Sequence, residues 1–210
     1  MTVSATEAQT AAPDWRVLAG KLHSTFNTGT FAAGAHFIAR LTTLAEAANH
    51  HPDVDLRYGV VHISLHSHDV GAITQRDINL AAEISELARS LDIEPHPHTA
   101  ITTEIAVDAL DIAAVKPFWR SVFGYNDGDD ELVDPAGVGP TLWFQQMDEP
   151  RPQRNRIHID VWVANDIAER RVAAAIEAGG RLVSDSDAPS FWVLADAEGN
   201  EACICATTNS

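Results

Sequence analysis

The first part of the chain combines two short strand-like patterns with one long helical pattern. Residues 15–18 and 21–26 predict two short strands. Over residues 31–49 apolar side chains recur at positions that share one helical face, which predicts a helix. Pro52 cannot continue this helix, so we expect it to end at Asn49. The first dozen residues predict only a frayed tail or a loose helical lead-in.

The next pattern predicts two more strands and a second helix. Residues 54–58 and 59–66 read as strands. In the second of them every other side chain is apolar, whereas the alternate positions carry His62, Ser64, His66 and, beyond the strand, His68. Thr74 can cap a helix over residues 74–91, whose apolar positions gather on one side.

The segment 94–99, with the sequence EPHPHT, interrupts this pattern. Two prolines two residues apart favour extended backbone and exclude a helix. We therefore predict a first domain over residues 1–96, a linker over residues 97–102 and a second domain over residues 103–210.

The second domain contains an internal repeat. A strand, a helix that ends at glycine and three further strands are predicted over residues 103–147, and the same order returns over residues 156–206. Aligning the two copies sets Glu104 opposite His158 and Thr141 opposite Glu201. The predicted fold class is therefore α+β in two domains, the second a doubled βαβββ unit.

Charge and composition exclude several classes of partner. The 210-residue chain is 45% apolar and 21% charged, which is typical of soluble globular proteins. Its net charge of −16 argues against nucleic acid as a partner, since a phosphate backbone would be repelled. No apolar run approaches the roughly 18 residues that span a membrane. The N-terminal stretch lacks the basic region and apolar core of a secretory signal.

The spacing of the two cysteines indicates their oxidation state and hence a cellular compartment. Cys203 and Cys205 lie two residues apart in a predicted strand, where a disulfide between them would be strained. We expect free, buried thiols and a reducing cytoplasm.

The histidines are the candidate chemistry. Nine of the ten lie within residues 1–98, and the motif E-x-x-x-H-H-P places Glu46, His50, His51 and Pro52 across the end of a predicted helix. Glu46 and His50 are one helical turn apart and can interact directly. Three interpretations compete for these histidines: capping of the helix C-terminus, metal binding and acid–base chemistry near neutral pH. No cysteine or spaced carboxylate completes a recognisable zinc pattern.

The combination of this motif with a Tyr58–Val61–His62 strand, a Ser67–His68 pair and a D-I-N-L-A helix resembles the pterin-4a-carbinolamine dehydratases (4a-hydroxytetrahydrobiopterin dehydratases). The resemblance covers most of residues 15–92. It implies a four-stranded antiparallel sheet backed by helices and a homodimer or homotetramer. It also implies removal of water from 4a-hydroxytetrahydropterin to give quinonoid dihydropterin, as part of pterin cofactor recycling.

The resemblance assigns roles to particular positions. The catalytic histidines fall on His50, His51 and His68. We assign His50 and His68 to the two proton transfers, in either order, and His51 to holding the pterin. The remaining positions implied to contact the pterin or to orient the histidines are Glu46, Asn49, Ser67, Asp69 and Asp77. No metal and no cofactor is implied, and His62 and His66 are expected to be bystanders. Residues 70–73 depart from a more usual glycine-rich run, which leaves the loop detail open.

The second domain resembles the glyoxalase-like branch of the vicinal oxygen chelate superfamily. That fold often holds a metal through four side chains, which here fall near Glu104, Thr141, His158 and Glu201. Threonine is a poor fourth ligand, so the site departs from the metal pattern. His158 and Glu201 can instead be polar groups satisfied inside a curved sheet. Arg154 and Arg156 offer an anionic ligand a binding site or form exposed ion pairs.

The sequence thus favours a pterin carbinolamine dehydratase that acts on a small molecule and carries a glyoxalase-like partner domain. Two alternatives from other classes stay open. One is a non-catalytic binding or regulatory protein whose second domain senses a small ligand. The other is a metal-dependent lyase or dioxygenase run by the second domain.

Overall fold

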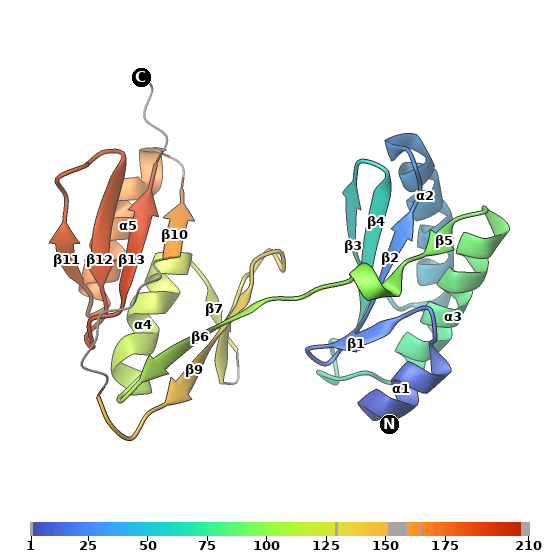
Figure 1. Ribbon diagram of the computed structural model, residues 1–210, viewed down its shortest axis with the longest axis horizontal. Helices are drawn as coiled ribbons and strands as arrows, with labels where there is room; N and C mark the ends of the chain where they lie inside the picture. Colours follow the sequence, from blue (N-terminus) through green and yellow to red (C-terminus); the bar gives the residue numbers. More distant parts are fainter. Residues whose placement is uncertain (1, 129, 151–158, 164, 207–210) are drawn as a thin grey trace. The chain divides into compact units, whose positions relative to one another are not determined.

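The computed structural model describes residues 2–128, 130–150, 159–163 and 165–206. The chain divides into two compact units, residues 1–102 and 103–210 (Figure 1). Each unit combines helices with its own sheet or sheets. The predicted α+β class in two domains is confirmed.

The first unit is an antiparallel sheet with helices on one face (Figure 1). Its strand order is β1-β2-β4-β3, and a two-residue β5 also pairs with β2. The strands are β1 (Arg16–Leu18), β2 (Lys21–Asn27), β3 (Asp53–Arg57), β4 (Val60–Leu65) and β5 (Glu94–Pro95). The helices are α1 (Ala5–Ala11), α2 (Phe31–Ala48) and α3 (Gln75–Ser90).

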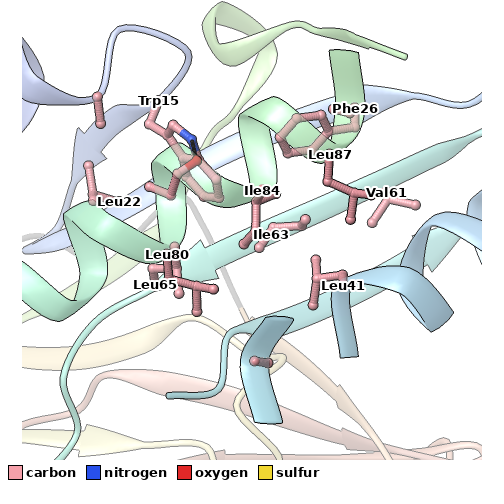
Figure 2. Packing of buried hydrophobic residues seen from close by; sticks show 14 of the residues in the cluster. Trp15, Leu22, Phe26, Leu41, Val61, Ile63, Leu65, Leu80, Ile84 and Leu87 are labelled. Atoms are coloured by element: carbon pink, nitrogen blue, oxygen red, sulfur yellow. Dashed lines mark hydrogen bonds between the residues drawn. The ribbon is translucent and has the colours of Figure 1, made fainter. Parts of the chain in front are cut away.

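The alternation seen in the sequence of β4 sets the two faces of this sheet. Val61, Ile63 and Leu65 are at most 2% exposed and face the helices. They pack with side chains from β2, α2 and α3, as Figure 2 shows for Phe26, Leu41 and Ile84 among others. His62 and Ser64 point to the opposite face of the sheet. The strand that leads to the candidate site is thereby anchored by its apolar face.

Trp15 ties the N-terminal segment to the same core. It is fully buried, and its indole Nε1 donates to the Ala81 carbonyl at 3.2 Å and lies 3.1 Å from Ser85 Oγ. Its ring meets Phe26 edge-on, with centroids 5.9 Å apart (Figure 2). A buried indole with a satisfied N–H contributes both apolar area and a fixed orientation.

The N-terminal segment is more ordered than its sequence suggested. Residues 5–11 form the regular helix α1, which begins with a capping box between Ser4 and Glu7. Ala8 and Ala12 are buried in the core, and Val3 N donates to the Ile73 carbonyl at 2.9 Å. Of the two alternatives for this segment, the structure has the helical lead-in and not the frayed tail, because the Ser-x-x-Glu signal starts the helix and two small apolar residues bury one side of it.

The proline-rich segment after α3 also makes regular contacts. Pro95 and Glu94 pair with Phe26 and Asn27, respectively, and residues 97–99 form a 3₁₀ turn in which Pro97 is buried. Extended backbone favoured by proline is equally suited to a short edge strand. Residues 94–95 therefore extend the first sheet, and the turn over residues 97–99 follows them directly.

The second unit repeats one βαβββ motif, as predicted. Two four-stranded sheets have the orders β6-β9-β8-β7 and β10-β13-β12-β11, and in each the first strand pairs in parallel with the last. The first copy comprises β6 (Glu104–Ala109), α4 (Ile112–Phe123), β7 (Asn126–Asp127), β8 (Glu131–Val133) and β9 (Thr141–Gln146). The second comprises β10 (Ile159–Trp162), α5 (Asn165–Glu177), β11 (Arg181–Ser184), β12 (Phe191–Ala195) and β13 (Glu201–Cys205).

A buried carboxylate organises the last turn of this unit. Asp196 is fully buried and accepts hydrogen bonds from Trp119 Nε1 at 3.0 Å, from the backbone of Glu198 and from both nitrogens of Asn200. The turn between β12 and β13 is thereby fixed to α4. In the part of the chain that the structure describes, no helix is long and apolar enough to cross a membrane.

Candidate active site

At the end of α2, two neighbouring histidines differ in burial: His50 is buried and His51 is exposed. Asn49 adopts the left-handed conformation (φ 46°, ψ 43°), a geometry that asparagine tolerates at a helix end. His50 N then donates back to the Ala45 carbonyl at 3.1 Å. As a result His50 is 7% exposed, whereas the side chain of His51 is 56% exposed.

A buried carboxylate holds His50. The distance from His50 Nε2 to Asp77 Oδ1 is 2.7 Å, and Asp77 is fully buried. The other carboxylate oxygen, Oδ2, accepts from Thr74 N and from Ser67 Oγ, both at 2.7 Å. One carboxylate therefore connects the end of α2, the segment after β4 and the first turn of α3.

The hydrogen bonds to Asp77 keep it ionised. Burial acts to raise the pKa of Asp77, but the hydrogen bonds from Thr74, Ser67 and His50 outweigh it and leave the pKa below its ordinary value. An ionised carboxylate only accepts, so His50 Nε2 carries the hydrogen in this contact. Nδ1 is then the nitrogen of His50 left for a substrate.

A tight loop presents His68. Ser67 N donates to the Ala72 carbonyl at 3.1 Å, and the Ser67 carbonyl accepts from Gly71 N at 2.9 Å. Gly71 has φ 66°, so the residues that replace the glycine-rich run keep a glycine where the backbone turns left-handed. His68 is exposed at the start of this loop, and its ring lies against that of His66.

The outer candidate residues have partners of their own. His51 Nε2 lies 3.1 Å from Glu46 Oε1, and Asp69 pairs with Arg76. The sequence suggested that Glu46 and His50 interact. This expectation was wrong, because the left-handed Asn49 turns His50 toward Asp77 and leaves His51 over the last helical turn.

The structure thus joins some candidate residues and separates others. His50, Ser67 and Asp77 share one buried network, and His68 follows Ser67 directly. His51, Asn49 and Asp69 lie on the exposed surface around it. Thr74 belongs to the network as well, since its Oγ1 lies 2.8 Å from Ser67 Oγ. Its only signal in the sequence was that of a helix cap.

The candidate metal positions of the second unit are only partly described. Glu104 and Thr141 are direct neighbours on β6 and β9, and Glu201 begins β13. His158, Arg154 and Arg156 lie outside the described residues. Among the residues that are described, no three His, Cys, Asp or Glu side chains are arranged to hold a metal ion.

The thiols of the second unit are free and buried. Burial and the nearby Asp160 raise the pKa of Cys203 to about 11. Because the thiolate is the nucleophile, we expect iodoacetamide at pH 8 to modify Cys203 at least about tenfold more slowly in the folded chain than in urea. Timed alkylation followed by mass spectrometry measures both rates, and equal rates would contradict the expectation.

Comparisons with known proteins match a different family to each of the two units of the chain. Residues 1–87 match the family described as Pterin 4 alpha carbinolamine dehydratase, and residues 104–205 match the family described as Glyoxalase-like domain. A protein of Chloroflexus aurantiacus, named provisionally as a pterin-4-alpha-carbinolamine dehydratase, is 43% identical over 75 residues, which is 36% of this chain and 81% of the relative.

Solved structures are similar to parts of the chain. A transcriptional coactivator/pterin dehydratase from Brucella melitensis is 24% identical and aligns with 42% of this chain and 99% of its own, with a TM-score of 0.40. A glyoxalase/dioxygenase from Nostoc punctiforme is 14% identical and aligns with 54% of this chain and 96% of its own, with a TM-score of 0.43.

Proposed function

The chain belongs to the pterin 4 alpha carbinolamine dehydratase family, and from this membership we propose that it removes water from 4a-hydroxytetrahydropterin to give quinonoid dihydropterin, in pterin cofactor recycling. The observation that carries the proposal is the buried pair of His50 and Asp77, 2.7 Å apart, next to the segment that presents His68. A carboxylate-oriented imidazole is a common arrangement for a group that transfers protons near neutral pH.

The reaction needs two proton transfers and no change of oxidation state by an external agent. The C4a–O bond breaks as the hydroxyl group takes a proton and leaves as water. The proton on N5 is lost, and its electron pair forms the C4a=N5 double bond. One imidazole gives a proton and another takes one, and we assign these two roles to His50 and His68.

The rest of the site is assigned to binding and support. His51, whose Nε2 lies 3.1 Å from Glu46 Oε1, is proposed to hold the pterin, together with the exposed Asn49 and Asp69. Ser67, which the resemblance placed among the pterin contacts, is fully buried and donates to Asp77, so we assign it to supporting that carboxylate. Asp77 orients His50 through Nε2, so that Nδ1 faces the substrate. We also propose a cytoplasmic homodimer or homotetramer, following the resemblance to the family.

The proposal is tested by a dehydration assay on the full chain. 4a-Hydroxytetrahydropterin is supplied, and the absorbance of the quinonoid product is followed with and without protein, before and after dialysis against a metal chelator. We expect a large acceleration over buffer that dialysis leaves unchanged. A rate equal to that of buffer would overturn the proposal and favour the binding or regulatory alternative. Activity lost on dialysis would favour metal chemistry in the second unit.

A further inference from the structure

His66, expected from the sequence to be a bystander, makes a close contact with His68. The two ring centroids are 4.2 Å apart, and the ring planes are inclined by 71°. Edge-to-face contacts of this kind favour a defined relative orientation of two rings. Because His68 is exposed on a loop, this contact with His66 restricts the direction of its imidazole.

The backbone at His66 is unusually well fixed. Leu65 on one side is 1% exposed and packs in the core, and Ser67 on the other side is fully buried and donates to Asp77. His66 therefore cannot shift without disturbing two buried neighbours. The His66 ring is thereby held in a fixed place beside the exposed ring of His68.

A hydrogen bond through Nδ1 does not account for the presence of His66. His66 Nδ1 is buried and has no hydrogen-bond partner among the described residues. Buried side-chain nitrogens that serve only the fold are normally hydrogen-bonded. By contrast, His62, on the same face of β4, lies 3.1 Å from Thr25 Oγ1 through its Nδ1.

We propose that His66 is a positioning residue for His68, holding the His68 imidazole by edge-to-face packing in the orientation that proton transfer to or from the pterin requires. The inference rests on the proposed dehydratase function and adds a residue to its site. The place of His51 is consistent with this. β3 begins two residues after His51, and its Asp53 pairs with Ser64, two residues before His66, so His51 and His66 lie at the same end of the hairpin.

The charged groups around His66 affect whether its ring carries a proton beside His68. Lys21 on β2, Asp53 on β3, Asp77 on α3 and His68 all act on it. Burial, then Lys21 and His68, lower the pKa of His66, and the two carboxylates offset this only in part. These groups favour the neutral form of His66, and a neutral ring does not repel a proton carried by His68.

The test compares four variants of the full chain in the dehydration assay. His66→Ala removes the contact, and His66→Phe keeps a ring without nitrogens. His68→Ala gives the loss of activity when the His68 imidazole itself is removed. His62→Ala is the matched control on the same strand face. We expect His66→Ala to lower kcat about tenfold with KM changed less than twofold, since misplacing a catalytic group by about 1 Å can cost up to 100-fold. His66→Phe should recover most of the loss.

The outcomes separate this inference from the proposed function. A wild-type chain without activity would defeat the proposed function itself. An active wild type with His66→Ala and His66→Phe both at the wild-type kcat would overturn the positioning role. A loss in His66→Ala that His62→Ala matches, or that His66→Phe does not relieve although circular dichroism shows it folded, would overturn it too.

Discussion

Replacing His50 with alanine is expected to lower turnover of 4a-hydroxytetrahydropterin at least about 100-fold. A general acid or base typically accelerates such a step about 100- to 10,000-fold, and His50 is the candidate histidine that a buried carboxylate orients. The loss should appear in kcat, because the alanine variant retains His51 and the exposed residues around it for binding. Steady-state rates of quinonoid product formation measure it.

The control for this experiment lies on the same helix. His36 is an exposed histidine of α2, and His36→Ala is expected to keep the wild-type rate. His50→Gln retains a group that can donate to Asp77 but cannot exchange protons near pH 7, so it should lose activity and still fold. If His50→Gln turned over substrate at the wild-type rate, His50 would have no part in proton transfer.

Replacing Asp77 with alanine is expected to destabilise the first unit by about 3–5 kcal/mol, because several buried donors lose hydrogen bonds to a charged acceptor that are worth about 1.5–3 kcal/mol each and are not fully additive. The variant leaves His50 Nε2, Ser67 Oγ and Thr74 N without the acceptor that they share. It also removes the capping box at the start of α3. Each of these groups is buried, so water does not replace the lost bonds.

Hydrogen exchange measures this loss within the first unit. Amide protection along α3 should fall by about two to four orders of magnitude in Asp77→Ala, since each 1.4 kcal/mol corresponds to a factor of ten. Glu86→Ala is the matched control, because Glu86 is an exposed carboxylate of the same helix paired with Arg89. Protection equal to the wild type in Asp77→Ala would show that the carboxylate does not support the fold.

The same carboxylate has a consequence for acid stability. The pKa of Asp77 is lower in the folded chain than its ordinary value of 3.8, so the unfolded chain takes up the proton first as the pH falls. The stability contributed by Asp77 is therefore complete above pH 3.8 and is lost as the pH falls through its depressed pKa. In Asp77→Asn this component of the acid loss should be absent.

Much of the fold follows from local sequence signals. The spacing of apolar residues over 31–49 and the stop at Pro52 predict α2 within one residue, and the alternation around Ile63 predicts the buried face of β4. The βαβββ order of the second unit is recognised from the sequence because the same order of patterns occurs twice. These features depend on neighbours in the sequence, which is why pattern alone finds them.

Contacts in the candidate site depend on geometry that the pattern does not contain. One left-handed residue, Asn49, decides that His50 rather than His51 turns inward, and hence that Glu46 meets His51. The contact between His66 and His68 is a property of ring orientation beyond the end of β4. Both contacts depend on how the elements pack. The spacing of residues along the chain does not determine which way their side chains point, so it does not predict these contacts.

The burial of Asp77 affects what can be inferred when a domain of this kind changes over time. Because Asp77 supports the fold, a copy of the domain that had lost its chemistry would still be selected to keep this carboxylate. His68 is exposed and has no comparable duty to the fold. Under the proposed mechanism, the loss of His68 among descendants of this chain would therefore mark the loss of catalysis, whereas the retention of Asp77 would mark only a domain that still folds.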